Sequence, residues 1–274
     1  MTGRGKSPTK GGAKNKNAPL AVKPFLQYLR RLAGGKLFGL AGWLLALALG
    51  CWATPRLYHQ FITHVPSLRR ENWQQTLMER QRELAVPWQD RRPLVLLAGD
   101  SHIEYGNWYA LFAGGWAVRN CGLASATIAD VTALVSAIGD PHPRMVVLMC
   151  GVNNLWTRPS IDVVINDYER LLNTVRSHLH PESIIVLSIM PLRESRLDRA
   201  SHEFNMHVAQ FNVALKACCL QHQVMFLNVN PAVTDARGGL AEGFTVDGLH
   251  LNAAGYGRLA GMMAPHLPPP VNAP

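Results

Sequence analysis

The first 70 positions of this 274-residue chain contain no acidic residue, and the first one is Glu71. Residues 1–90 hold 14 of the 27 Lys and Arg residues but only 4 of the 18 Asp and Glu residues, and the remainder is close to neutral. The formal net charge of +9 therefore belongs to the leader. This distribution excludes nucleic-acid binding by the remainder, because that role requires a basic surface on the folded domain.

The five cysteines lack the spacing that metal sites and disulfide frameworks require. They stand at positions 51, 121, 150, 218 and 219 without a CxxC pair, and an odd number cannot form a complete set of disulfides. We expect most of them to be small, buried hydrophobic side chains. The sequence indicates no metal ion, no cofactor and no internal repeat.

One apolar run, Leu37–Ala53, contains no charged residue. Its length is near the lower limit for a membrane-spanning helix, roughly 17 residues, and Lys36 and Arg56 can extend to the headgroups at its ends. Basic residues precede the run and only Arg56 lies just after it, which places the amino terminus in the cytoplasm and the rest of the chain outside. A cleaved secretory signal is the alternative, but the leader is long and 51–53 is a poor cleavage site.

Composition divides the chain into five parts. Residues 54–92, which follow the apolar run, include spaced apolar side chains that suggest a short amphipathic helix at 67–84, although a solvated spacer is the favoured interpretation. The parts are a basic, largely disordered cytoplasmic tail (1–36), a transmembrane anchor (37–53), a juxtamembrane linker (54–92), one folded domain (93–267) and a Pro-rich tail (268–274).

After Arg92 the chain alternates short apolar runs with helical patterns. Five runs have the length and continuity of fully buried parallel strands: 93–98, 116–121, 145–150, 184–189 and 224–227. Helical patterns lie between and after them, at 107–113, 127–138, 161–179, 201–221 and 252–264. This alternation predicts an α/β fold, a three-layer α/β/α sandwich in which helices cover both faces of a five-stranded parallel sheet.

Reactive or flexible residues follow four of these strands, where open parallel sheets bind ligands. Ser101, after the first strand, can act as a nucleophile, and Gly122, after the second, can bring its N–H close to a ligand. Asn153, after the third, offers an amide to a developing oxyanion. Asp247, three residues before His250, can hold the imidazole so that its other nitrogen accepts the serine proton. Each segment alone also has an ordinary explanation as a turn or a helix cap.

Together the four segments resemble the SGNH (GDSL-like) hydrolase family, whose Ser, Gly, Asn and His lie in separate blocks in this order. The resemblance extends over about 94–267 and depends on the co-occurrence of the blocks. It implies a flavodoxin-like sandwich in which Ser101, Asp247 and His250 form a catalytic triad. It also implies an oxyanion hole made by the N–H groups of Ser101 and Gly122 and by the Asn153 amide.

Two positions depart from the family pattern. His102 stands where the GDSL signature has Leu. We expect its side chain to point away from the chemistry, so that its replacement by Ala has a mild effect; a contact with the substrate is the alternative. Asn154 stands where the usual GxND block has Asp, which keeps hydrogen bonding but removes a charge. The charged loop 190–199 could contact a polar substrate, but a solvated surface loop is the favoured interpretation.

The resemblance and the charge pattern together predict a single-pass, membrane-anchored serine esterase with its catalytic domain in the periplasm. Its substrates would be O-acyl esters, with small acyl groups such as acetyl preferred, on an envelope polysaccharide, peptidoglycan or lipid. An O-acyltransferase on the same fold is the alternative, because a sugar hydroxyl can replace water in resolving an acyl-serine intermediate. A non-catalytic subunit of an envelope biosynthesis complex is the second alternative.

The charge asymmetry about Leu37–Ala53 predicts that the carboxyl terminus lies outside the cytoplasm. Alkaline phosphatase fused after Pro274 should therefore be active, and a reporter that works only in the cytoplasm should be inactive at the same position. An inactive phosphatase together with an active cytoplasmic reporter would reverse the assigned topology.

Overall fold

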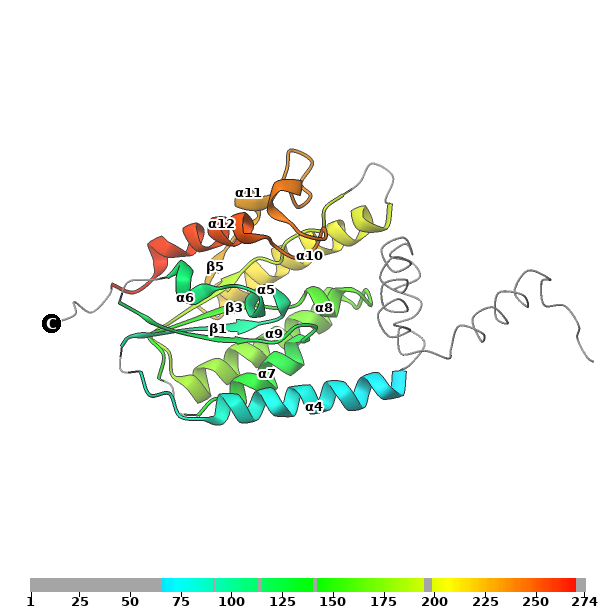
Figure 1. The fold of residues 1–274 in the computed structure, drawn as a ribbon. Helices are drawn as coiled ribbons and strands as arrows, with labels where there is room; N and C mark the ends of the chain where they lie inside the picture. The colour runs from blue at the N-terminus through cyan, green and yellow to red at the C-terminus, as the bar shows by residue number, and fades with distance from the viewer. Residues whose placement is uncertain (1–65, 91, 113–114, 140–141, 195–198, 270–274) are drawn as a thin grey trace, which may run out of the picture. The chain divides into compact units, whose positions relative to one another are not determined.

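A computed structural model of the chain describes residues 66–90, 92–112, 115–139, 142–194 and 199–269. The sheet lies within one compact unit, Arg70–Pro274 (Figure 1). None of the helices in the described ranges is long and apolar enough to cross a membrane. The run predicted to do so, Leu37–Ala53, lies outside these ranges.

Five parallel strands form one sheet in the order β2-β1-β3-β4-β5, which is the order of flavodoxin-like folds. Their bounds are β1 Leu94–Gly99, β2 Ala117–Gly122, β3 Met145–Met149, β4 Ser183–Leu187 and β5 Met225–Leu227. β1 is flanked on both sides, with Gly99 level with Gly122 in β2 and with Met149 in β3. The predicted five-stranded parallel sheet is confirmed, and each strand lies within two residues of its predicted bounds.

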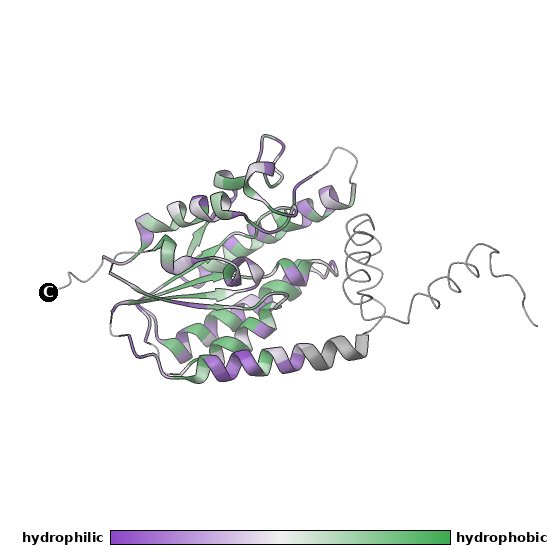
Figure 2. Ribbon diagram, viewed as in Figure 1, coloured by the Kyte–Doolittle hydropathy of each residue, from purple (hydrophilic) through white to green (hydrophobic). Residues whose placement is uncertain are grey.

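Alternate residues of the strands belong to two hydrophobic cores, one on each face of the sheet. Hydrophobic residues recur along the helices on both sides of the sheet (Figure 2). Leu96 and Leu148 lie in one core, and Val95 and Val147 lie in the other. The first core is covered by α4 Pro66–Ala85, α7 Ile128–Ser136, α8 Val152–Leu155, α9 Ile161–Thr174 with its π-helical continuation Val175–Leu179, and α10 Arg199–Gln221. The second is covered by α5 Ser101–Glu104, α6 Trp108–Leu111, α11 Asn230–Val233 and α12 Ala253–Met263. The three-layer architecture is therefore confirmed.

Capping side chains set where two of the predicted helices begin. Thr127 and Asp130 form a reciprocal capping box at the start of α7, and Asn252 accepts the N–H of Gly255 at the start of α12. Each cap satisfies backbone N–H groups that have no partner inside the helix. These residues stand at the starts predicted from the sequence, 127 and 252.

α4 packs on the sheet domain along one side. Leu84 is buried in the first core, and Trp73 and Leu77 pack against the same core. The buried side chain of Arg119 on β2 donates a hydrogen bond to the carbonyl oxygen of Leu84 at 2.8 Å. The linker 54–92 therefore includes a helix that belongs to the domain, and the interpretation of this whole stretch as a solvated spacer is wrong for α4.

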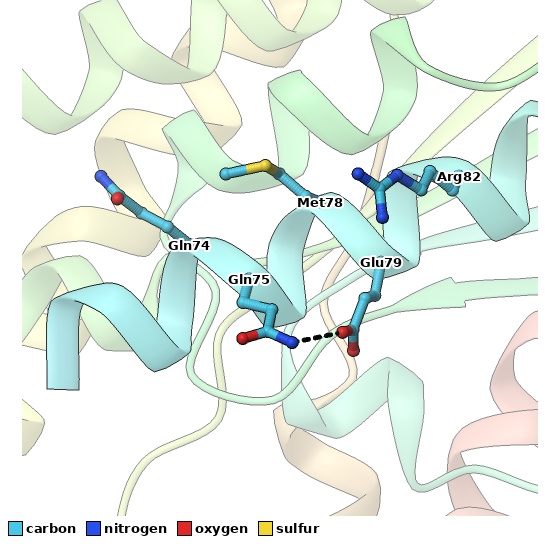
Figure 3. Close-up of a pocket in the computed structure, with 5 residues that line it drawn as sticks. All are labelled: Gln74, Gln75, Met78, Glu79 and Arg82. Atoms are coloured by element: carbon cyan, nitrogen blue, oxygen red, sulfur yellow. Dashed lines mark hydrogen bonds between the residues drawn. The ribbon is translucent and has the colours of Figure 1, made fainter. Parts of the chain in front are cut away.

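The outward side of α4 is polar. Its side chains line a shallow hollow of about 370 Å³, in which Gln75 donates a hydrogen bond to Glu79 at 2.8 Å (Figure 3). The lining residues, Gln74, Gln75, Met78, Glu79 and Arg82, all belong to this one helix. None of the residues predicted to carry chemistry lies there.

The cysteines of the described residues are buried and free, as expected of small hydrophobic side chains. Cys121 is the second-last residue of β2 and Cys150 follows β3, so β1 separates them and prevents a disulfide. Burial raises the pKa of the Cys121 thiol to about 12, which leaves almost no reactive thiolate at neutral pH. Cys218 and Cys219 lie in α10, and Cys51 lies outside the described residues.

The packing of α4 predicts that Leu84→Ala lowers the free energy of unfolding by about 2–5 kcal/mol, because it leaves a cavity beneath the helix. Met78→Ala is the matched control on the same helix, since Met78 is half exposed, and it should change stability by less than about 0.5 kcal/mol. Urea unfolding of the purified variants and of the wild-type chain measures both changes in the free energy of unfolding. Equal stability of the two variants would mean that α4 does not pack as described.

Candidate active site

Ser101, His250 and Asp247 form a hydrogen-bonded chain at the carboxyl ends of the strands. Nε2 of His250 lies 3.0 Å from Oγ of Ser101, and its Nδ1 lies 2.6 Å from Oδ2 of Asp247. With Nδ1–H donating to the carboxylate, Nε2 is the nitrogen that can accept the serine proton. Ser101 and His250 are 149 positions apart, so only the fold brings them together.

The turn that presents Ser101 depends on the glycine before it. A Cβ on Gly99 would lie 2.0 Å from the carbonyl oxygen of Met149, which leaves no room for any other residue. Asp100 then caps the short helix α5 by accepting the N–H of His102 at 3.0 Å. Ser101 is the first residue of α5, and its N–H has no acceptor among the described residues.

A tight turn holds Asp247 and His250 in register. Oδ1 of Asp247 accepts the N–H groups of Leu249 at 2.9 Å and of His250 at 2.7 Å, and Gly248 between them has a φ of +90°. The hydroxyl of Thr245 donates to the carbonyl of His250 at 2.8 Å. The turn therefore orients both side chains before any substrate binds.

Hydrogen bonds keep the Asp247 carboxyl ionised. Burial on its own would raise the pKa of this group, but the side chain of His250 and the backbone N–H groups of His250 and Leu249 donate to it. Their combined effect holds the pKa of Asp247 below its ordinary value. The carboxylate can thus stabilise a positively charged His250 during a reaction.

Asn153 and Asn154 both lie in α8, directly after β3. Nδ2 of Asn153 donates to the carbonyl of Ala126 at 3.0 Å, which fixes the amide and leaves its second N–H for a ligand. Oδ1 of Asn154 accepts the N–H of Ile128, the first residue of α7, at 3.0 Å. The amide of Asn154 thus keeps the hydrogen-bonding role expected at this position.

The prediction that Gly122 donates its N–H to a ligand is wrong for this structure. That N–H already donates to Oδ1 of Asn120 at 2.9 Å. A Cβ on Gly122 would lie 2.3 Å from the backbone nitrogen of Glu104 in α5. The glycine is therefore required because α5 packs against the end of β2.

Ser125, three residues further on, has the free N–H that was expected of Gly122. The N–H of Ala124 donates to Glu104 and that of Ala126 to Leu123, whereas that of Ser125 has no acceptor among the described residues. Ser125 also has a φ of +65°, a conformation that is uncommon for a residue with a side chain and is found at functional sites. No sequence pattern reveals this conformation in a serine.

His102 is buried behind the hydrogen-bonded chain. Its Nδ1 lies 3.1 Å from Oδ1 of Asp100, and its Nε2 lies 3.0 Å from the carbonyl oxygen of Leu249. The expectation that this side chain points away from the chemistry is therefore only half correct. It is out of reach of a substrate, but it contacts the turn that carries Asp247 and His250.

The described part of the loop 190–199 also supports this turn. The backbone N–H of Arg193 donates to the carbonyl of Gly248 at 2.8 Å, and the Arg193 side chain pairs with Glu242 at 2.9 Å. The loop is thus tied to the site through its backbone, in addition to having a solvated surface. Residues 195–198, which include Arg196 and Asp198, lie outside the described residues.

Within the described ranges, one group of side chains has the composition and spacing of metal ligands. Glu169, Cys218 and His222 bring their ligand atoms within 4.8 Å of one another. Cys218 and His222 precede β5, so they lie toward the amino ends of the strands. Ser101 lies at the carboxyl ends, and this group is therefore separate from the candidate active site.

The model of the GDSL-like lipase/acylhydrolase family matches residues 96–258, which is more than half of the chain and includes all five predicted site residues. The chain belongs to this family. It is therefore an enzyme that hydrolyses ester bonds, as the sequence predicts. No curated relative matches this GDSL-like acylhydrolase by sequence.

Solved structures share the fold of this GDSL-like acylhydrolase. A candidate platelet activating factor from Streptococcus pneumonia is 24% identical, with a TM-score of 0.64 over 73% of this chain and 96% of that one. A GDSL-like lipase from Bacteroides thetaiotaomicron is 18% identical, with a TM-score of 0.55 over 70% and 95%. A catalytic mutant of an acetylxylan esterase from Geobacillus stearothermophilus is 16% identical, with a TM-score of 0.50 over 65% and 94%.

The hydrogen bonds to Asp247 predict a carboxyl that titrates below the ordinary value for Asp, about 3.9. Because the pKa is lowered by folding, the carboxylate stabilises the native state above about pH 4, and this contribution is lost as the pH falls through the folded pKa. Carboxyl ¹³C NMR titration should show the low pKa, and His250→Ala should raise it. An unchanged pKa in His250→Ala would contradict the assigned hydrogen bond.

Proposed function

We propose that this enzyme is a membrane-anchored serine esterase that removes O-acyl groups, including acetyl, from an envelope polysaccharide, peptidoglycan or lipid. The observation that carries the proposal is the chain of hydrogen bonds from Asp247 through His250 to Ser101, with distances of 2.6 and 3.0 Å. In this proposal Ser101 is the nucleophile, His250 the general base and Asp247 the residue that orients and stabilises the imidazole.

The reaction proceeds through an acyl-enzyme. Oγ of Ser101 attacks the ester carbonyl while Nε2 of His250 takes the hydroxyl proton, and the tetrahedral intermediate collapses as His250 returns that proton to the leaving alcohol. Water, deprotonated by Nε2 of His250, then attacks the acyl-serine. The second tetrahedral intermediate collapses as His250 returns this proton to Oγ of Ser101, which releases the carboxylic acid and restores the serine. Each step moves one proton through His250, so no other acid or base is required.

The negative oxygen of the tetrahedral intermediate needs hydrogen-bond donors. In the proposal these are the N–H of Ser101, the second N–H of the Asn153 amide and, in place of Gly122, the N–H of Ser125. The first and third have no acceptor among the described residues, and the hydrogen bond to Ala126 orients the Asn153 amide. Oriented donors of this kind stabilise the transition state because they need no reorganisation during the reaction.

The placement outside the cytoplasm is supported by the sequence of the leader. Its basic residues precede the uncharged run Leu37–Ala53, which orients such a run with its amino end in the cytoplasm. The nearly neutral charge after residue 90 suits a neutral or mixed polymer better than a polyanion. One protein with this fold is by name an acetylxylan esterase, so an acetylated polysaccharide is a substrate that the fold accommodates.

The effects of substitutions in the proposed triad on turnover should not be additive, because its members act as one unit. Ser101→Ala should remove nearly all turnover of p-nitrophenyl acetate by the purified full-length chain, and adding His250→Ala should lower it little further. Asn153→Ala should leave the triad intact and lower kcat by about 100- to 1000-fold, the usual effect of losing one oxyanion donor.

Ser136→Ala is the matched control for these variants, because Ser136 is an exposed serine in α7 and its loss should leave turnover unchanged. Circular dichroism establishes that each variant is folded. Near wild-type turnover in a folded Ser101→Ala variant would refute the assigned nucleophile, and with it the proposed mechanism.

A further inference from the structure

Both ring nitrogens of His102 face hydrogen-bond acceptors. Nε2 lies 3.0 Å from the carbonyl oxygen of Leu249, and Nδ1 lies 3.1 Å from Oδ1 of Asp100. His102 is 1% exposed and Asp100 is 0% exposed, so water does not compete for these contacts. The side chain is thus enclosed between the start of α5 and the turn that carries Asp247 and His250.

The geometry fixes where the protons lie. A carbonyl oxygen can only accept, so Nε2 carries a proton. A neutral ring would then turn the lone pair of Nδ1 toward a carboxylate oxygen, and the contact is favourable only when a second proton lies between Nδ1 and Asp100. Oδ2 of Asp100 is buried without a hydrogen-bond partner, which makes an unpaired charge on this carboxylate more costly still.

Electrostatics agrees with a protonated ring. Burial on its own would lower the pKa of His102, but the hydrogen bond and charge of Asp100, the Leu249 carbonyl and the charge of Asp247 outweigh burial and raise it. The ring is therefore a suitable donor at both nitrogens. It cannot serve as a second general base, because neither nitrogen is free.

We propose that His102 is a positioning residue that fastens the turn carrying Ser101 to the turn carrying Asp247 and His250. The proposal rests on the proposed function, because its consequence is the alignment of Ser101 with His250. It assigns no contact between His102 and the substrate.

The hydrogen bond from His102 to the Leu249 carbonyl is important because few other side-chain hydrogen bonds join the two turns. Within the described residues, two side-chain hydrogen bonds join these turns: Ser101 to His250, and His102 to the Leu249 carbonyl. The first must break in each catalytic cycle, when His250 gives its proton to the leaving group. The second can persist throughout, so it can hold His250 in place while the first is broken.

The neighbouring carbonyls of the same turn are held from other directions. The Gly248 carbonyl accepts the N–H of Arg193, and the His250 carbonyl accepts the hydroxyl of Thr245. Neither bond reaches the segment of Ser101. Of these three carbonyls, only that of Leu249 is bonded to the segment of Ser101, and its donor within the described residues is His102.

Three substitutions test the two hydrogen bonds of the His102 ring separately. His102→Gln keeps a donor near the position of Nε2, His102→Asn keeps one near Nδ1, and His102→Leu keeps neither. We expect kcat to fall by about 10- to 100-fold in the Asn and Leu variants, the effect of a small misalignment of reacting groups, with KM changed by less than about twofold. The Gln variant should retain kcat to within about fivefold, because the bond to Leu249 is preserved.

His178 provides the matched control, because its Nε2 also contacts a backbone carbonyl, that of Ile138, at 2.9 Å but in the π-helical segment after α9. His178→Asn should leave kcat unchanged. The rate at which a fluorophosphonate labels Ser101, followed by mass spectrometry, should fall in parallel with kcat in the His102 variants. In the wild-type chain, ¹⁵N NMR should show a His102 Nε2–H that is protected from exchange.

Several results would overturn the proposal. It fails if folded Asn and Leu variants keep kcat and the labelling rate within twofold of wild type, or if Gln is impaired as much as Asn. The absence of a protected Nε2–H in the wild-type chain also overturns it, whatever the stability of the variants. Failure of the proposed function is distinct, since the fluorophosphonate would then leave wild-type Ser101 unlabelled.

Discussion

Parallel pairing of β1 with a strand on each side brings three groups of the candidate site together. The carboxyl ends of β2, β1 and β3 lie level, so the segments that follow them leave the sheet at one edge and supply Ser125, Ser101 and Asn153. The close approach of β3 also explains Gly99, since a side chain there would meet the Met149 carbonyl. The turn that carries Asp247 and His250 lies near the end of the domain in sequence, and it contacts this edge through the hydrogen bond of His250 to Ser101.

The sequence predicts the parts of this arrangement that depend on composition and short spacing. Buried parallel strands are continuous apolar runs, so their number and bounds were predictable, and the three-residue spacing of Asp247 and His250 is short enough for one turn to join them. The choice of Gly122 was wrong because a glycine that permits packing and a glycine that binds a ligand have the same sequence signal. Which N–H is free depends on the Asn120 side chain, and that contact follows from folding.

Two further features depend on contacts between distant segments. α4 carries few apolar residues, and its membership in the domain depends on the burial of Leu84 and on the hydrogen bond from Arg119, 35 positions away. His102 looks like a replacement of Leu at a permissive position of the GDSL signature. Its role becomes visible only when the carbonyl of Leu249, 147 positions away, is brought to its ring. A histidine beside the proposed nucleophile can therefore influence the site through the backbone of a remote turn.

The buried thiols have a consequence for biogenesis. If the domain folds outside the cytoplasm, as proposed, the unfolded chain delivers the four cysteines that follow the anchor into an oxidising compartment, where exposed thiolates form mixed or incorrect disulfides. In the native state burial raises the pKa of Cys121 and of Cys219 to about 12, and both become inert. Correct maturation then requires that the sheet and α10 form, and bury these thiols, before the thiols are oxidised.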